Sequence, residues 1–394
     1  MGAEGEVPVE GLGATQPTGR RKVLYAASSF GHLASFHIPY IEALRGDGFD
    51  VTLLAGGDPA RVHLPQGARC VPVEFVKSMS APANFKTAAA IASLQAHERF
   101  DVVLTHTSLA AFFVRLGLMG AALHAHAARP YVVNTVHGYL FDGASSAPRR
   151  AALLAAERIC APVTSRIVVM NRQDAAIARA HKLCRGDVVE TPGMGVVLDG
   201  LSPATPRSKS EARARLHLPE DAFVCLCVAE FSARKNQRTL IEALQSLPEH
   251  VLLALPGTGA LLEECRGLAV SAGFGSRVLF PGFLARDELA VWRRASDVCV
   301  SASRYEGLPF HVVEAFACGL PGVLSAVKGH EDLVEPGQTG LLYPFGDADA
   351  FAACIRRLLD NPSELAHMGV CACKAAQRYA LPAVMPGLLR IYEE

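Results

Sequence analysis

The sequence lacks an excess of charge of either sign. Its 394 residues include 38 lysines and arginines and 38 aspartates and glutamates, so the formal net charge is zero. A balanced chain has no broad electrostatic attraction for nucleic acid or anionic lipid, although a local basic patch stays open. We therefore expect no nucleic-acid partner.

The sequence also lacks cysteine pairs of the CxxC type. Its 11 cysteines lie mostly inside apolar runs, as Cys225, Cys227 and Cys318 do. This usage favours a reduced chain over a disulfide framework or a zinc site. His124 and His126 have no acidic neighbour in the sequence, and we interpret them as structural groups rather than zinc ligands.

A long uncharged apolar run is missing too. The most apolar segment, 108–128, is interrupted by Arg115 and His124, whereas a membrane-spanning helix needs roughly 18 uncharged apolar residues. Residues 1–19 lack the apolar block of a signal peptide and are expected to form a disordered tail. We expect a cytoplasmic protein, in which 108–128 forms buried helices. A peripheral contact of this segment with the inner face of the cell membrane stays open.

Apolar segments alternate with helical windows along the chain, and this order predicts an α/β protein with parallel sheets. After the strand at 22–28 we expect a loop over 29–37 and a helix that opens at Pro39. The loop contains one glycine and no GxGxxG, which disfavours a dinucleotide-dependent oxidoreductase. The other predicted strands are 50–57, 102–107, 131–138 and 166–171 in the first half, and 222–232, 251–257, 277–283, 298–303 and 321–326 in the second.

The two series of strands predict two Rossmann-like, doubly wound domains that face a central cleft. We expect the first domain over 20–200 and the second over 216–380. The polar, proline-interrupted stretch 201–215 is the predicted linker. The last residues, 381–394, form an amphipathic pattern typical of a helix, and we assign them to the first domain.

The stretch "SRYEGLPFHVVEAFACGLPG" (303–322) carries two glutamates in a mostly apolar segment. It follows a predicted strand, so Glu306 lies in a strand-to-helix loop and Glu314 in the first turns of the helix. Open parallel sheets bind ligands at this edge. The free backbone amides near Phe310, His311 and Val312 can bind an anion at the helix N-terminus.

The segment "EGLPFHVVEA" resembles the Glu-Gly-x-Pro…Glu-Ala signature of family 4 retaining glycosyltransferases, which have the GT-B fold. The resemblance extends over nearly all of 21–394. It implies that Glu306 faces the hydroxyls of the transferred sugar and Glu314 those of the ribose. It also places the amides near Phe310 to Val312 on the diphosphate.

A second group of residues fits a nucleotide sugar. Arg234 and Lys235 come after a strand and before a helix, where two cations can neutralise a leaving diphosphate. Many family members have a Gly-Arg pair after this strand, whereas this sequence has Ala229 and Glu230. Glu230 cannot supply that charge.

The resemblance assigns further contacts. Phe283 and Leu284, in "PGFLARDEL", are the candidates for contact with the nucleobase. Gly31 and His32 are expected to lie beside the donor phosphates, and His137, at a strand end before a glycine, to face the reacting centre. His37 is equally compatible with a core position and with the site.

The first half also resembles a narrower branch of bacterial enzymes that extend undecaprenyl-diphosphate-linked sugars in capsule, exopolysaccharide or glycan assembly. The resemblance implies transfer of a hexose or N-acetylhexosamine, with retention, from a UDP-linked donor to a polyprenyl-diphosphate-linked saccharide. Lys235, Arg234 and the helix amides can stabilise the leaving diphosphate, so we expect no metal and no cofactor. A sugar-nucleotide epimerase of similar fold and a non-catalytic nucleotide-sugar-binding partner remain the alternatives.

Overall fold

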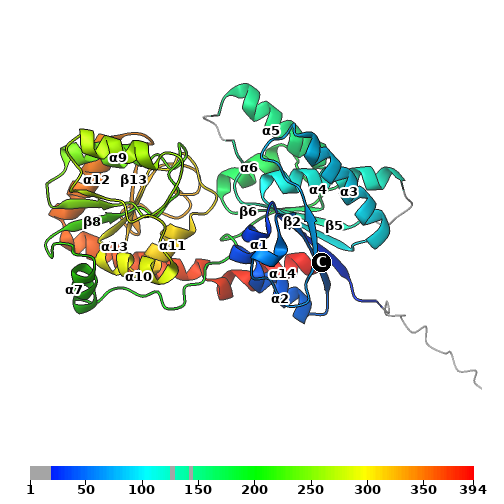
Figure 1. Cartoon of the computed structure of the whole chain (residues 1–394), viewed down its shortest axis with the longest axis horizontal. Coiled ribbons are helices and arrows are strands. Elements are labelled where there is room, and N and C mark those ends of the chain that lie inside the picture. Colours follow the sequence, from blue (N-terminus) through cyan, green and yellow to red (C-terminus); the bar gives the residue numbers. More distant parts are fainter. Residues whose placement is uncertain (1–18, 125–128, 142–144) are drawn as a thin grey trace, which may run out of the picture.

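The computed structural model describes residues 19–124, 129–141 and 145–394, which form two lobes (Figure 1). All but the last residue of the predicted tail, and also His126, lie outside the described residues. Each lobe is built on one parallel sheet with helices on its faces. The prediction of two Rossmann-like domains is therefore confirmed.

The first sheet has seven strands in the order β3-β2-β1-β4-β5-β6-β7. The interior strands are almost continuously apolar because helices cover both faces of the sheet. Its strands are β1 (Lys22–Ala26), β2 (Asp50–Gly56), β3 (Arg69–Val73), β4 (Val102–His106), β5 (Tyr131–Val136), β6 (Arg166–Val169) and β7 (Val188–Glu190). Its helices are α1 (Phe30–Phe36), α2 (Ile38–Gly46), η1 (Pro59–Arg61), α3 (Pro82–Glu98), α4 (Ser108–His124), α5 (Ala147–Cys160) and α6 (Arg172–Ala180).

The second sheet has six strands in the order β10-β9-β8-β11-β12-β13. Its strands are β8 (Phe223–Leu226), β9 (Val251–Ala254), β10 (Val278–Leu279), β11 (Val298–Ser301), β12 (Gly322–Ser325) and β13 (Gly340–Tyr343). The helices from here to the C-terminus are α7 (Pro206–Arg215), α8 (Gln237–Glu242), η2 (Ala243–Ser246), α9 (Leu262–Ser271), α10 (Arg286–Ala295), α11 (Phe310–Ala317), α12 (Ala348–Asp360), α13 (Pro362–Ala376), η3 (Gln377–Tyr379) and α14 (Leu381–Glu393).

The segment 29–37 differs from the expected loop. Residues Phe30–Phe36 form helix α1, which begins where the Ser29 side chain accepts a hydrogen bond from the backbone amide of His32. A serine at this position caps the otherwise unpaired amides of a first helical turn. Helix α2 then follows with Pro39 in its first turn, as predicted.

The chain crosses from the first domain to the second at Gly195. Met194 packs in the core of the first domain and Val196 in the core of the second. Gly195 has φ +75°, and a Cβ there would lie 2.7 Å from Cα of Leu381, so only glycine fits. The predicted linker 201–215 therefore differs from the structure: most of it forms α7, which packs against α10 of the second domain.

Helix α14 brings the end of the chain back to the first domain, beneath α1 and beside α2 in Figure 1. Val384, Leu388 and Tyr392 are buried in the core of that domain. The return crossing pairs with the first one, because the amide of Leu381 donates to the carbonyl of Val196 (2.9 Å). Two adjacent crossings thus connect the domains.

A search of the described residues finds no helix that is both long enough and apolar enough to span a membrane. Within the expected buried segment, α4 packs against α3 and α5. Arg115 of α4 is fully buried and forms an ion pair with Glu157 of α5 (3.0 Å).

Candidate active site

The strand order reverses at one point in each sheet, between β1 and β4 in the first and between β8 and β11 in the second. Ligands of open α/β sheets bind at such switch points, beyond the carboxyl ends of the strands. His32 follows β1, Lys235 follows β8 and Glu306 follows β11. These three residues line one interdomain cavity of about 480 Å³, together with Arg234, His137 and His311.

Glu306 lies between two cations at the base of this cavity. Its carboxylate accepts hydrogen bonds from Nζ of Lys235 (2.6 Å) and from the guanidinium of Arg234 (2.8 Å). Glu306 and Lys235 are buried, whereas Arg234 is partly exposed. The structure thus brings together three predicted residues, and it shows an ion-pair triad that the sequence did not reveal.

The triad changes the acidity of the glutamate. Burial by itself raises the pKa of Glu306, but Lys235 and Arg234 outweigh burial and lower the pKa to about 2. The carboxylate is therefore charged at neutral pH. It can accept hydrogen bonds from hydroxyl groups while it holds both cations in place.

We expect the stability contributed by this triad to depend on pH. Because the pKa falls from 4.5 to about 2 on folding, the contribution is full above about pH 4.5 and is lost as the pH falls toward 2. The shift corresponds to about 3 kcal/mol. Urea unfolding of the parent and of Glu306→Gln should give a difference that shrinks between pH 5 and about pH 2.5. An equal difference at both values would contradict the assignment.

The two domains touch beside the triad through a pair of glycines. A Cβ on Gly307 would lie 1.8 Å from the carbonyl oxygen of His137, and one on Gly138 would lie 3.1 Å from Cα of Gly307. Neither position accommodates a side chain. The glycine after Glu306 in the motif therefore lets the loop after β11 approach the loop after β5.

Histidines from four positions gather on the first-domain side of the cavity. His106, at the end of β4, contacts His137 through Nδ1 and Nε2 (3.3 Å), and the hydroxyl of Tyr25 contacts Nδ1 of His37 (2.9 Å). Burial, followed by the proximity of His32, lowers the pKa of His137 to about 3, so its imidazole is neutral at pH 7. His37 is fully buried within this group. His106 was not predicted.

Among the described residues, His32, His37 and His137 each place one ring nitrogen within 4.8 Å of the others. Three neutral imidazoles at this spacing can hold a divalent transition-metal ion. The prediction that the protein needs no metal stays a prediction. The side chain of His124 and the whole of His126 lie outside the part of the chain that the structure describes.

Gly31 lies apart from this group of histidines. It is exposed in the first turn of α1 and does not line the cavity, although His32 beside it does. Its predicted position beside the donor phosphates stays a prediction. Because glycine has no side chain, only its backbone could contact a phosphate.

Helix α11 begins at the cavity. Of the three backbone amides predicted to be free in its first turn, one has a partner. The amide of Val312 donates to the carbonyl of Pro309 (3.0 Å), and the Val312 side chain is buried in the second domain. Val312 is therefore not available to a ligand, which corrects the prediction. The amides of Phe310 and His311 occupy the first turn, where helices have no internal partners.

Glu314, also on α11, forms an ion pair with Arg293 of α10. Arg293 is almost fully buried, whereas about a quarter of the Glu314 side chain is exposed. The guanidinium therefore fixes the carboxylate. Glu314 is not among the residues that line the interdomain cavity, so its contact with the ribose stays a prediction. The sequence offered no signal for Arg293, because its partner lies on the next helix of the chain.

Replacing Glu314 with alanine should weaken nucleotide binding more than turnover. The carboxylate is the predicted ligand of the two ribose hydroxyls, and its loss also leaves Arg293 buried without a partner. We expect the dissociation constant of UDP to rise about 10-fold or more. Titration calorimetry with UDP measures this effect, and Glu211→Ala, an exposed site on α7, is the control. Unchanged affinity for UDP would eliminate Glu314 as a nucleotide ligand.

A second cavity, of about 430 Å³, lies in the second domain. Phe283 and Leu284 line it, as do the residues after β8 and the glycine turn 256–259. Phe283 is 80% exposed, so its ring is available for stacking. A Cβ on Gly257 would lie 1.9 Å from the carbonyl oxygen of Ala229, which explains the glycine: two loops meet there.

A buried ion pair joins the two domains near the cavity. Nζ of Lys328, after β12, lies 3.0 Å from a carboxylate oxygen of Asp174 on α6 and donates to the carbonyl of Tyr139 (2.7 Å). Both charged groups are almost fully buried. Burial raises the pKa of Asp174, and Lys328 opposes this rise only in part. The sequence did not single out either residue.

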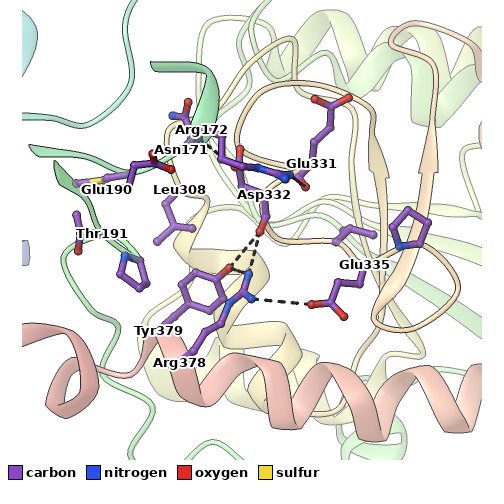
Figure 2. A pocket seen from close by; sticks show the side chains of 14 residues that line it. Asn171, Arg172, Glu190, Thr191, Leu308, Glu331, Asp332, Glu335, Arg378 and Tyr379 are labelled. Carbon is purple, nitrogen blue, oxygen red and sulfur yellow. Dashed lines mark hydrogen bonds and ion pairs between the residues drawn. The ribbon is translucent and has the colours of Figure 1, made fainter. Parts of the chain in front are cut away.

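Another cavity, of about 720 Å³, lies between the domains near the crossings. Figure 2 shows Arg378 and Tyr379 directed at the backbone of Asp332, and the carboxylate of Asp332 accepts a bond from Arg172 of the first domain (3.0 Å). Asp332, Glu331 and Glu335 all line this cavity. Their negative charge disfavours the binding of a diphosphate there. We interpret these contacts as interdomain connections.

Comparison with known proteins relates this geometry to an activity. Residues 208–373 match the family described as Glycosyl transferases group 1, and residues 39–192 match the Glycosyl transferase 4-like domain. EpsD of Bacillus subtilis, a protein named as a glycosyltransferase, is 27% identical over 377 residues, which cover 94% of this chain and 96% of EpsD. A UDP-Gal:alpha-D-GlcNAc-diphosphoundecaprenol alpha-1,3-galactosyltransferase of Escherichia coli is 25% identical over 328 residues, covering 81% of this chain and 82% of its own.

Solved structures share the fold over the whole length. The sucrose-phosphate synthase of Thermosynechococcus elongatus has a TM-score of 0.77 at 25% identity and covers 95% of this chain and 98% of its own. HepE of Anabaena, solved with UDP-glucose, has a TM-score of 0.73 at 20% identity and covers 94% of this chain and 99% of its own. The chain is therefore a glycosyltransferase of GT-B fold, with a glycosyl transferase 4-like domain in its first half and a group 1 glycosyl transferase domain in its second.

Proposed function

We propose that the protein transfers a hexose or N-acetylhexosamine from a UDP-sugar to a lipid-diphosphate-linked saccharide, with retention at the anomeric carbon. The observation that carries the proposal is the triad of Glu306, Lys235 and Arg234, placed where the switch points of both sheets face each other. A donor whose base enters the cavity beside Phe283 and Leu284 would extend its diphosphate toward these cations.

The basic residues and the glutamates have different proposed roles. As the donor diphosphate leaves, negative charge develops on it, and Lys235, Arg234 and the first-turn amides of α11 stabilise that charge. Glu306 accepts hydrogen bonds from sugar hydroxyls, while Glu314 does so from the ribose. Since these cations and amides already offset the charge of the leaving group, we propose that transfer needs no metal ion.

The acceptor approaches from the first domain. His137 is neutral and lies at the domain contact, so it can accept or donate a hydrogen bond to the incoming hydroxyl without adding charge. In the proposed front-face reaction the acceptor oxygen bonds to the anomeric carbon as the bond to the diphosphate breaks. The acceptor proton passes to the leaving diphosphate oxygen, so no residue of the protein has to act as the base that accepts it.

Two relatives support the choice of substrates. The name of the Escherichia coli relative gives UDP-galactose as donor and a diphosphoundecaprenol-linked sugar as acceptor. HepE has been solved with UDP-glucose. By analogy we propose a UDP-linked donor and a polyprenyl-diphosphate-linked acceptor for this chain, acting at the inner face of the cell membrane.

The test is a screen of UDP-sugars with the purified protein, with and without polyprenyl-diphosphate-linked N-acetylglucosamine, followed by mass spectrometry and by NMR of the product's anomeric centre. We expect one UDP-sugar to give a product of the same anomeric configuration, with a rate that EDTA leaves unchanged. An isomerised donor in the absence of acceptor would indicate an epimerase. Binding of UDP-sugar without any product in the screen would indicate a non-catalytic partner.

A further inference from the structure

A third cavity, of about 290 Å³, opens on the first domain beside the active-site cleft. Its volume is near the lower end of the range for ligand pockets, ~300–1,000 Å³. Four segments build it: the loop 77–79 before α3, the start of α4, the loop after β5 and the middle of α5. The side chains that form its apolar wall are Met79, Leu109, Phe112, Leu140, Phe141, Leu153 and Ala156.

The polar groups near this cavity are withdrawn from it. Tyr139 is 4% exposed, and its hydroxyl is buried without a hydrogen bond. Among the described lining residues the only carboxylate is that of Glu157, and both of its oxygens are bound by Arg115 (3.0 and 3.1 Å). The cavity is therefore suited to a largely apolar ligand.

The cavity shares one lining residue with the active-site cleft. Leu140 lines both, and it is 43% exposed. Lys328 of the second domain fixes the adjoining backbone by donating to the carbonyls of Tyr139 (2.7 Å) and Phe141 (3.3 Å). A ligand in the cavity can therefore extend past Leu140 toward His137.

Cations lie at the edge of the cavity. The exposed Lys77 belongs to its lining, and the guanidinium of the exposed Arg149 donates to the carbonyl of Leu140 (3.4 Å). Apolar side chains that are exposed next to Lys77, Val76 and Met79, extend the apolar wall outward. An apolar pocket, a basic edge and a polar cleft therefore lie close together.

We propose that this pocket binds the isoprenoid chain of the acceptor next to its diphosphate, with the diphosphate at Lys77 and Arg149 and the saccharide in the cleft. The inference rests on the proposed lipid-linked acceptor and deepens it, because it states which part of the lipid this protein recognises. Charge complementarity with Lys77 and Arg149 selects a polyprenyl diphosphate over an uncharged lipid, and the shared Leu140 brings the cleft within reach of the saccharide.

The first experiment measures binding. Titration calorimetry should show that farnesyl diphosphate binds at least about 10-fold more tightly than farnesol or inorganic diphosphate, because only the whole molecule fills both parts of the site. UDP should not displace it. Displacement by UDP, or equal affinity for inorganic diphosphate, would place the ligand in the donor site and overturn the proposal.

Matched variants locate the ligand. Ala156→Trp fills the pocket, whereas Ala155→Trp adds the same side chain at an exposed position of α5. Lys77→Ala removes a cation at the edge, and Lys86→Ala removes an exposed one on α3. The first member of each pair should weaken the binding of farnesyl diphosphate at least about 10-fold. The control should change the dissociation constant by less than about 2-fold. Equal effects within both pairs would refute the site, and the Lys77 pair decides if Ala156→Trp fails to fold.

A transfer assay separates this inference from the proposed function. With a polyprenyl-diphosphate saccharide, Ala156→Trp should raise KM while kcat stays near that of Ala155→Trp. If the parent transfers sugar and Ala156→Trp leaves KM unchanged, the pocket assignment is wrong and the function stands. If the variants change farnesyl diphosphate binding as expected but the parent transfers sugar to no lipid-linked saccharide, the site stands and the acceptor class is wrong. Loss of binding to phosphatidylglycerol vesicles alone would assign the pocket to membrane contact instead.

Discussion

Replacing Lys235 with alanine should reduce the rate of sugar transfer on the order of 100-fold. The ammonium group is buried at the base of the cleft and contacts Glu306 at 2.6 Å. A fixed cation in a dry site stabilises developing negative charge without rearranging, whereas water would have to reorganise. Single-turnover kinetics with saturating UDP-sugar report this loss directly, because neither product release nor donor affinity contributes.

Two variants make the result specific. Arg238→Ala removes an exposed cation on α8, the helix that follows Lys235, and should leave the rate within about 2-fold of the parent. Lys235→Arg keeps the charge but changes its shape, so it should restore only part of the rate. If Lys235→Ala turns over like Arg238→Ala, Lys235 holds Glu306 in place and does not act on the diphosphate.

Deleting residues 381–394 should abolish transfer by unfolding the first domain. The deletion removes Val384, Leu388 and Tyr392 from the core of that domain, and it also removes one of the two crossings at Val196. Each large apolar side chain lost from a core costs about 2–5 kcal/mol, which together rivals the stability of a typical domain, ~5–15 kcal/mol. UDP affinity, which depends on the second domain, should be partly retained.

Point variants test the same idea without removing the helix. Leu388→Ala should lower the free energy of unfolding by about 2–5 kcal/mol in urea denaturation, since Leu388 is 1% exposed. Arg390→Ala, on the exposed side of α14, should change it by less than about 0.5 kcal/mol. A truncated protein that transfers sugar at the parental rate would show that α14 is dispensable to the acceptor domain.

The interior strands of both sheets could be predicted because helices bury them on both faces. Their sequences, such as those of β4 and β11, are apolar without alternation, and this pattern is visible in one dimension. The edge strands β3, β7 and β13 were missed. β3 begins at Arg69 and contains Pro72, and β7 has only three residues, so neither shows a long apolar run. β13 is apolar but no longer than four residues, so its pattern does not separate a strand from a buried loop. They form because a neighbouring strand offers its free edge.

Local motifs likewise singled out Glu306, Glu314 and Lys235 as candidates, because a strand followed by a helix places its loop at the ligand-binding edge wherever it occurs. The partners of these residues could not be read in this way. Lys235 and Glu306 are 71 positions apart, and nothing in either segment identifies the other. The same holds for Arg293 beside Glu314.

The sequence by itself determined two α/β domains, the glycosyltransferase signature and the side chains that carry charge to the cleft, because periodicity and short motifs depend on neighbours in the chain. The tertiary structure alone decided the crossing at Gly195, the histidine group, the Lys328–Asp174 pair and the apolar pocket beside Leu140. Each of these depends on how closely two distant segments approach. That distance is set by packing of the whole core, which no local pattern records.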